Sequence, residues 1–398
     1  MELFAGPCVV PGFRFAGVHA GIKNKAGARD LGLGVADAPA SAAAVFTTNR
    51  VKAAPVVLAG ERMRAGRLQA IAANSGCANC LTGRAGLALA RASCQAVAAG
   101  LKIAPALVLP CSTGIIGHLY SLSAYRAGVE RAVRALRPDA MGDFAEAIMT
   151  TDTRPKAVHC RFPLGRGAAT VAGIAKGAGM IAPAMATMLA FIVTDAPAAP
   201  AELRSALGAA LPGSFHAISV DGDMSTNDCV VLAASAAAAR RPLQARARRL
   251  LDEAVACVAR ALAREIVRDG EGATKLVEIV VKGAASRADA LRVARKVANS
   301  PLVKTAFYGC DPNVGRIAAA AGASGARLDP RRLAISLGGV KVAAHGALRL
   351  SALSAAATKM RAPEFAVEID LGLGRGEARM LSCDLSAGYV RINAEYPT

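Results

Sequence analysis

Residues 176–189 read KGAGMIAPAMATML, and this stretch decides how the fold is interpreted. It is apolar almost throughout, yet it opens with Lys176 and carries one threonine, Thr187, near its end. The uncharged run that contains it, 178–193, is shorter than the roughly 20 residues needed to cross a bilayer. We therefore expect a buried strand or a pair of loops here, and the single hydroxyl requires an explanation.

Composition indicates a large globular protein. The 398 residues suffice for two domains or for one layered domain with a substantial core, and 54% of them are hydrophobic. The formal charge is +19, but the basic residues are scattered and tryptophan is absent, so we expect no nucleic-acid partner. The N-terminus has no basic segment, and Pro7 and Pro11 interrupt its apolar run. These features predict a cytoplasmic protein without a secretory signal or membrane segment.

The ten cysteines show no ligand or disulfide pattern. Only Cys77 and Cys80 form a CxxC motif, and the histidines are isolated. A structural zinc site needs four ligands, usually in paired spacing. We therefore expect buried, reduced cysteines, and neither a metal site nor a bound cofactor.

Hydrophobic periodicity predicts a layered α+β fold. Helices are expected at 83–101, 245–267 and 286–300, with two more around Pro138 within 121–150. Strand-like runs occupy 68–76, 106–117, 168–175, 188–194, 228–234, 276–282, 333–343, 365–370 and 377–393. Because strands group with strands and helices with helices, layered sheets are favoured over regular βαβ alternation.

Three further motifs have structural interpretations. DGDMSTND at 221–228 begins like a calcium loop, but it lacks the glycine and glutamate that such a loop requires, so a turn held by Asx and Ser/Thr hydrogen bonds is predicted. RDLGLG at 29–34 matches a coenzyme-A-binding pattern, but no helix start follows it. LGLGRG at 371–376 is predicted to be a hairpin turn.

Thr187 would become a strong nucleophile at the start of a chain. A threonine hydroxyl needs an adjacent base, and an N-terminal threonine carries one in its own α-amine, whose ordinary pKa is near 8. This requires a cut between Ala186 and Thr187, and the small Ala186 leaves room for the hydroxyl to attack the preceding carbonyl. Spacing alone does not distinguish this hypothesis from a core strand.

Long motifs in a fixed order along the chain give the stretch a context. They are GFRFAGVHAGIK, AAVFTTN, STGIIG, TTDTRPK, KGAGMIAPAMATMLAFIVTDA, SVDGDMSTND, RDGEGATK, KTAFYGCDPNVGRI and YVRINAEYPT. Together they resemble the ornithine acetyltransferase family, the bifunctional glutamate N-acetyltransferases of arginine biosynthesis. The resemblance implies an αββα-type sandwich shared with self-processing aminopeptidases. It also implies cleavage into an α chain, 1–186, and a β chain, 187–398, that assemble as an α2β2 heterotetramer.

The resemblance also assigns residues. Thr187 is the implied nucleophile, and Thr113 and Gly114 form the implied oxyanion hole. The implied substrate-binding residues are Thr153, Lys176, Thr187, Glu271, Asn393 and Thr398. Lys176 could pair with a substrate carboxylate, and Glu271 could attract a cationic amine.

The implied reaction is ping-pong acetyl transfer from N2-acetylornithine to glutamate through an acetyl-threonine ester, with acetyl-CoA as an alternative donor in bifunctional members. An N-terminal-threonine aminopeptidase of the same fold is the nearest alternative, and a basic binding protein that stays one chain is another. Two residues depart from the family pattern: Cys77 replaces an asparagine and Val314 replaces an aromatic residue.

Overall fold

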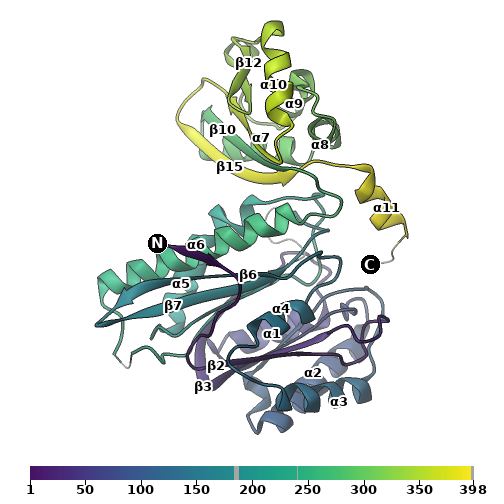
Figure 1. Ribbon diagram of the computed structural model, residues 1–398, viewed down its shortest axis with the longest axis vertical. Coiled ribbons are helices and arrows are strands. Elements are labelled where there is room, and N and C mark those ends of the chain that lie inside the picture. The colour runs from purple at the N-terminus through teal and green to yellow at the C-terminus, as the bar shows by residue number, and fades with distance from the viewer. Residues whose placement is uncertain (183–187, 240, 396–398) are drawn as a thin grey trace.

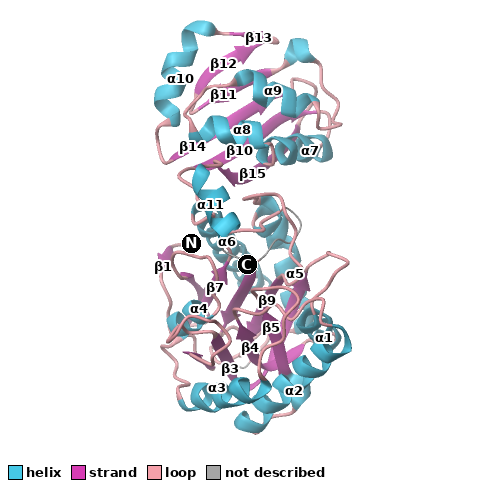
Figure 2. Ribbon diagram, turned by 90° about the vertical axis from the view of Figure 1, so that its right-hand side faces the viewer, coloured by secondary structure: helices cyan, strands magenta, loops and turns pink. Residues whose placement is uncertain are grey.

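The computed structural model describes residues 1–182, 188–239 and 241–395, which form two stacked α/β modules (Figure 1). The larger module contains the N-terminal part of the chain through helix α6 (Ala245–Arg268), and the smaller contains strands β10 (Leu276–Ala284) to β15 (Gly376–Cys383). The last helix, α11 (Ala387–Glu395), leaves the smaller module and returns toward the larger one (Figure 2).

Among the described residues, nine strands form the sheet of the larger module, in the order β1-β6-β7-β8-β9-β3-β4-β5, with β2 paired to β3. These strands are β1 Leu3–Ala5, β2 Phe13–Val18, β3 Leu31–Phe46, β4 Arg67–Asn74, β5 Val108–Ser112, β6 Lys156–Leu164, β7 Gly167–Lys176, β8 Leu189–Thr194 and β9 Cys229–Ala234. The helices of this module besides α6 are α1 Ala54–Met63, α2 Gly83–Leu101, α3 Leu122–Arg134, α4 Met141–Ala147 and α5 Pro200–Ala210, with short 3-10 turns at Pro105–Leu107, Leu211–Gly213 and Phe215–Ala217.

The long strand β3 lets this sheet form two facing layers. Its first part pairs with β2 and β4, its second part pairs with β9, and the register shifts between Val35 and Ala40. Such an irregularity bends a strand and increases its twist. One core cluster lies between the layers and joins Phe15 and Ile71 of one half to Ile174 and Phe191 of the other.

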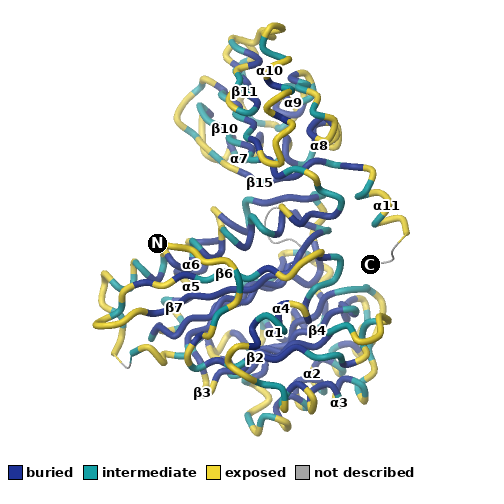
Figure 3. Tube along the Cα trace, viewed as in Figure 1, coloured by how far each residue is buried: buried dark blue, intermediate teal, exposed yellow. Residues whose placement is uncertain are grey.

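Helices cover the two outer faces, so the layers follow the order α-β-β-α. Leu203 of α5 and Leu262 of α6 share a core cluster with Val171 of β7. On the opposite face, Val97 of α2 and Val129 of α3 pack with strands β3, β4 and β5. Figure 3 shows the buried strands between more exposed helices. The predicted αββα sandwich is therefore confirmed for the larger module.

The smaller module was not anticipated as a separate layer. Six described strands form its sheet in the order β13-β12-β11-β14-β10-β15. Its remaining elements are β11 Ala334–Leu337, β12 Val340–Ala344, β13 Ala347–Leu348, β14 Glu364–Asp370, α7 Arg287–Ala298, α8 Pro301–Tyr308, α9 Val314–Gly322 and α10 Leu353–Met360, with 3-10 turns at Pro330–Arg332 and Leu350–Ala352. These elements enclose a core of their own.

Most predicted elements are confirmed, but three predictions in the smaller module are wrong. The single strand expected over 333–343 is a hairpin of β11 and β12, because Gly338 and Gly339, both with positive φ, turn the chain between them. The strand expected over 377–393 ends at Cys383, and helix α11 follows, because the Ser386 hydroxyl accepts a hydrogen bond from the Gly388 N–H at 3.0 Å and stabilises its first turn. The 371–376 segment is not a hairpin turn, since β14 and β15 both pair with β10, on its opposite sides. Helices α1, α5, α8, α9 and α10 were not predicted.

Phe144 tests the packing between the two sheet layers. It is fully buried, and its ring stacks on Phe15 and Phe191 with centroid separations of 6.2 and 5.1 Å. Phe144→Ala should lower the free energy of unfolding by about 3–5 kcal/mol, because it leaves a cavity in the core. Phe4→Ala, at a side chain that is 40% exposed, should change it by less than about 1 kcal/mol. Urea titrations of both variants measure the difference, and equal losses would contradict this packing.

Candidate active site

A cavity of about 320 Å³ collects residues from several distant segments. Five of the residues assigned by resemblance line it: Thr113, Gly114, Lys176, Glu271 and Asn393. Its other lining residues include Thr150, Thr151 and most of the 221–227 segment. The structure does not describe residues 183–187, which fall between Lys176 and strand β8 in the sequence. Ala186 and Thr187 are therefore outside the described residues, as is Thr398.

Thr113 and Gly114 follow β5 directly and offer two hydrogen-bond donors to the cavity. The Thr113 N–H donates to the Asn74 carbonyl at 3.0 Å and is therefore not available to bind a substrate oxygen. Among the hydrogen bonds of the described residues, none uses the Thr113 hydroxyl or the Gly114 N–H as a donor. A hydroxyl and an adjacent backbone N–H are suited to stabilise an oxyanion.

Gly114 occupies a position that only glycine can take without strain. Its φ is +124°, and a Cβ atom there would collide with the Gly76 backbone and lie 2.6 Å from the Cys77 nitrogen. The turn is pressed against the 76–78 segment, where Ala78 donates to the Ile115 carbonyl at 3.0 Å. This close approach fixes the direction of the Gly114 N–H.

Lys176 ends β7 inside a buried network of charges. Its side chain is only 2% exposed, and its Nζ lies 4.0 Å from an oxygen of Asp152. Lys156 makes the closer contacts, at 2.6 Å to Asp152 and 2.5 Å to Asp269. Burial lowers the pKa of Lys176, and Asp152 opposes that shift. Lys176 is thus a buried cation without a close ion-pair partner among the described residues, and it faces the cavity.

Asp152 shows the opposite balance. Burial raises the pKa of its carboxyl group, but Lys176 and Lys156 outweigh burial and lower the pKa to about 2. The Gly177 N–H also donates to Asp152, at 2.7 Å. Asp152 belongs to the TTDTRPK motif, although the sequence did not single it out as a site residue.

Thr153 does not line the described cavity. It is exposed, its N–H donates to Asp269 at 3.1 Å, and its hydroxyl donates to the same carboxylate. Thr150 and Thr151 of the same motif line the cavity instead. A substrate-binding role for Thr153 remains a prediction.

Glu271 and Asn393 meet at the cavity although 122 residues separate them. The Asn393 amide donates to the Glu271 carboxylate at 2.8 Å, so helix α11 brings the end of the chain to the site. Glu271 lies against Gly179 of the KGAG motif, where any Cβ would collide with its carboxyl group. The second glycine of KGAG therefore makes room for this carboxylate.

The 221–228 segment forms the predicted turn and also lines the cavity. Asp223 N–H donates to Asp221 at 3.1 Å, and Asn227 N–H donates to the Ser225 hydroxyl at 3.0 Å. The Asn227 amide also donates to the carbonyls of Ala78 and Ser112, at 2.8 and 2.9 Å. The sequence missed this second role, and the density of polar side chains in DGDMSTND was the available signal.

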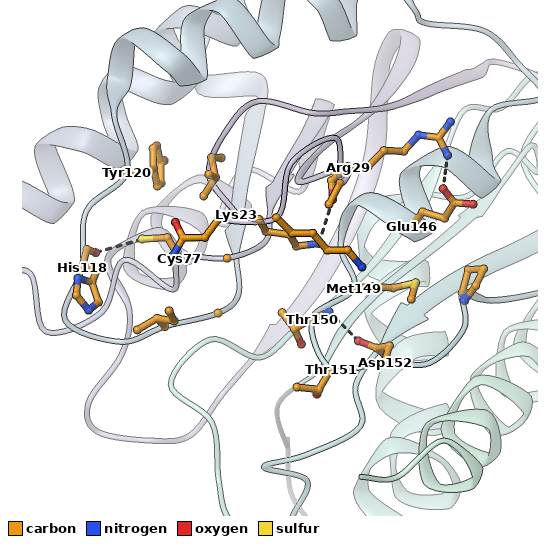
Figure 4. Close-up of a pocket in the computed structure, with 18 of the residues that line it drawn as sticks. Lys23, Arg29, Cys77, His118, Tyr120, Glu146, Met149, Thr150, Thr151 and Asp152 are labelled. Atoms are coloured by element: carbon orange, nitrogen blue, oxygen red, sulfur yellow. Dashed lines mark hydrogen bonds and ion pairs between the residues drawn. The ribbon is translucent and has the colours of Figure 1, made fainter. Parts of the chain in front are cut away.

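A second cavity of about 700 Å³ adjoins the first and shares Gly114, Thr150 and Thr151 with it. Figure 4 shows Lys23 and Arg29 at this cavity, with Cys77 beside His118. The Cys77 thiol lies 3.2 Å from the His118 carbonyl, and burial raises its pKa.

The two departures from the family pattern thus lie in different places. Cys77 lines the second cavity, next to the Gly114 turn. Val314 is buried in the core of the smaller module, where it begins α9. Only the Cys77 departure adjoins the site.

Comparison with known proteins identifies the family. The model of the ArgJ family matches residues 14–398. The chain belongs to the ArgJ family. It is 48% identical over 392 residues to the arginine biosynthesis bifunctional protein ArgJ of Geobacter sulfurreducens, covering 98% of this chain and 100% of that protein. The protein of the same name from Symbiobacterium thermophilum is 46% identical, with all of both chains covered.

Solved ArgJ structures match parts of the chain. The crystal structure of arginine biosynthesis bifunctional protein ArgJ from Bacillus halodurans has 38% sequence identity and a TM-score of 0.50, and the match covers 52% of this chain and 98% of that one. A structure of ornithine acetyltransferase complexed with ornithine from Mycobacterium tuberculosis has 40% sequence identity and a TM-score of 0.42, covering 46% of this chain and 98% of that one.

The described part of this ArgJ chain contains no group of three or more His, Cys, Asp or Glu residues placed to hold a metal ion. None of its described helices is long and apolar enough to span a membrane. All ten cysteines are free thiols, and seven of them are buried.

The buried charge network predicts a specific acid sensitivity. The pKa of Asp152 lies below its usual value of 3.8 in the folded protein, so Asp152 stabilises the fold above that pH. This contribution should be lost as the pH falls from about 4 to about 2. Lys156→Met should reduce the contribution and destabilise the protein by about 3–5 kcal/mol at neutral pH, because it leaves two carboxylates buried without their close cation.

Lys282→Met provides the control, since Lys282 pairs with Glu368 at 2.9 Å on the surface. It should cost less than about 1 kcal/mol. Chemical denaturation at several pH values measures both variants, and equal effects would contradict a structural role for the buried network.

Proposed function

We propose that this ArgJ protein transfers the acetyl group of N2-acetylornithine to glutamate, giving ornithine and N-acetylglutamate. Thr187 is the nucleophile, and a cut between Ala186 and Thr187 exposes its α-amine as the base. The observation that carries this proposal is the cavity in which Thr113, Gly114, Lys176, Glu271 and Asn393 converge. The full-length similarity to arginine biosynthesis bifunctional proteins supports the same reaction.

The Bacillus halodurans structure supports the cut. Its matched chain is 98% covered, yet it corresponds to 52% of this chain, or about 207 of 398 residues. Relatives of the same name are covered in full by this chain. A half-length chain is what cleavage would produce, and the proposed β chain has 398 − 186 = 212 residues.

The reaction proceeds through an acetyl-threonine ester. The Thr187 hydroxyl gives its proton to the α-amine while Oγ attacks the acetyl carbonyl. The Thr113 hydroxyl and the Gly114 N–H donate to the oxyanion that forms, and ornithine leaves with the proton. The α-amine of glutamate then attacks the ester, which yields N-acetylglutamate and restores Thr187.

The charges of the cavity match both substrates. Each carries an α-carboxylate, and Lys176 is the buried cation that can pair with it. Acetylornithine also carries a side-chain ammonium group, and Glu271, held by Asn393, offers it a carboxylate. Thr153 and Thr398 are retained as further substrate-binding residues by resemblance.

The second cavity is where we expect an anionic donor such as acetyl-CoA to enter. It reaches the proposed oxyanion hole at Gly114, and Lys23, Lys25 and Arg29 line it. We further expect the two products of cleavage to assemble as α2β2 in the cytoplasm, without nucleic acid or membrane partners. No metal or resident cofactor takes part in this scheme.

A denaturing gel tests the cut. The 40.3 kDa chain should appear as two bands of about 19 and 21 kDa, in proportion to 186 and 212 residues. Thr187→Ala should remain a single band and should show no acetyl transfer, because it lacks the nucleophile of both steps. A single full-length band in active wild-type protein would refute the scheme.

The oxyanion hole gives a graded prediction. Thr113→Val should lower kcat by about 10²–10³-fold with little change in KM, because the lost donor acts on charge that develops in the transition state. Thr358→Val is the control, since this exposed hydroxyl on α10 donates to the Ser354 carbonyl, away from the cavities. Steady-state assays of acetyl transfer compare the two, and a normal kcat in Thr113→Val would contradict the assignment.

The alternative function, an N-terminal-threonine aminopeptidase, predicts a different product pattern. In a hydrolase, water completes the reaction, so ornithine release would not depend on glutamate. The transferase requires glutamate for sustained release of ornithine. Measuring ornithine with and without glutamate therefore distinguishes the two functions.

A further inference from the structure

Asp228 is a buried carboxylate that binds Met188, the residue after the proposed nucleophile in the sequence, and no step so far uses it. It is fully buried, at the end of the 221–228 segment and directly before β9. Its Oδ1 accepts a hydrogen bond from the Met188 N–H at 2.9 Å. Its Oδ2 is buried and makes no hydrogen bond of ordinary geometry among the described residues, although the Thr47 and Ser225 side chains are near enough to lower the pKa of this carboxyl. An unpartnered buried carboxylate oxygen is costly, so its presence calls for an explanation.

The position of Met188 is fixed from both sides. While its N–H donates to Asp228, its carbonyl accepts from the Cys229 N–H at 3.1 Å. The Asp228 carbonyl in turn accepts from the Thr47 N–H at 3.1 Å. The carboxylate is therefore held against the peptide group that joins Met188 to Thr187.

Covalent geometry then limits how far Thr187 can be from this carboxylate. Whatever the torsion angles, the α-nitrogen of a residue lies within about 4 Å of the next residue's nitrogen, and its Oγ lies within about 5 Å. In this chain that next nitrogen is the Met188 nitrogen, which Asp228 binds at 2.9 Å. Because Thr187 precedes Met188 in the chain, covalent bonds alone keep its reactive atoms within about 8 Å of Asp228 Oδ1.

We propose that Asp228 is a further catalytic residue, whose Oδ2 binds Thr187 before and after the cut. This inference rests on the proposed function. Before the cut, Oδ2 takes the proton of the Thr187 hydroxyl as Oγ attacks the Ala186 carbonyl. The proton passes to the Thr187 nitrogen as the C–N bond breaks, and water then hydrolyses the Ala186 ester.

After the cut, the same oxygen accepts a hydrogen bond from the new α-amine. This bond orients the amine toward Oγ and stabilises the ammonium that forms when the amine takes the hydroxyl proton. A carboxylate that orients the base of a nucleophile is a recurring arrangement in acyl transfer. The ammonium returns its proton to the leaving amine of ornithine, so Asp228 itself is unchanged by acetyl transfer.

The electrostatic surroundings suit both roles. Burial raises the pKa of Asp228 to about 7, so the precursor carboxyl can act as a base near neutral pH. Lys176 faces Asp228 from β7 and lowers the pKa, and Glu271 in turn acts on Lys176. Cys229, the next residue, has a raised pKa and stays uncharged. A newly formed ammonium beside Asp228 would lower its pKa further and keep it ionised.

Asp228→Asn tests the proposal, because the amide can still accept from Met188 N–H but cannot take a proton. Cleavage should slow, as followed on denaturing gels over time. In the cut fraction, kcat should fall by about 10²-fold with KM nearly unchanged. The acid limb of the rate–pH profile should move to lower pH, because losing the carboxylate lowers the pKa of the α-amine. A residue with only a structural role would not move that limb.

Asp195→Asn is the matched control. Asp195 is also buried, also has a pKa raised by burial, and accepts the Thr170 N–H at 2.7 Å, but it follows the far end of β8. Asp195→Asn should leave cleavage, kcat and the acid limb of the rate–pH profile unchanged. Only its thermal midpoint should fall.

The possible results are distinguishable. If Asp228→Asn stays uncut, recovery of cleavage in Asp228→Glu supports the proposal, and failure to recover it with a lowered thermal midpoint refutes it in favour of a structural role. The proposal would also be refuted if Asp228→Asn matched the wild type in cleavage, in kcat and in the acid limb of the rate–pH profile. If wild-type protein neither splits nor transfers acetyl groups, the proposed function itself fails.

Discussion

The pairing of β7 with β8 is the constraint on which the site depends. Lys176, the last residue of β7, lies opposite Leu189, the first residue of β8. Residues 177–188 connect these two paired residues, so both ends of this excursion are anchored in the core. A cut before Thr187 would leave its α-amine two residues from a buried strand. That strand is also held on its other side by β9. An N-terminus is usually poorly ordered unless it is tied down, and this pairing would tie it down.

Carboxylates hold the excursion on both sides of the proposed cut. Asp221 accepts the N–H groups of Met180 and Ile181 at 2.6 and 2.8 Å, and Asp228 accepts that of Met188. Burial raises the pKa of both acids because no nearby cation outweighs it. Asp152 is as deeply buried, yet its pKa is lowered because two lysines face it. Burial therefore raises the pKa of Asp221 and Asp228, whereas the two lysines keep the pKa of Asp152 low.

The sequence predicted the elements with strong periodicity and missed those whose identity depends on distant contacts. Helix α6 follows its apolar spacing within one residue of the prediction, since Leu251, Val258 and Leu262 face one core. Helix α11 was mistaken for a strand because Tyr, Val and Ile favour strands locally, while its position is set by the contact of Asn393 with Glu271. Local patterns also could not reveal that the Thr113 N–H is already hydrogen-bonded to the Asn74 carbonyl. Nor could they reveal that Asp152 and Asp228 contact residues far along the chain.

The two modules and the two proposed chains divide the protein in different ways, and this has a functional consequence. A cut between Ala186 and Thr187 would fall inside the larger sandwich, between β7 and β8, rather than between modules. The α chain would keep the oxyanion donors and Lys176, whereas the β chain would hold the nucleophile, Glu271 and Asn393. Neither product could form the site alone. The antiparallel ladder from Val171–Thr194 to Lys176–Leu189, together with the pairing of β3 with β9, would therefore hold the two products together after the covalent link is gone. Cleavage would add a base to Thr187 without loosening the core, because the strand pairings that join the two products do not depend on the peptide bond that is cut.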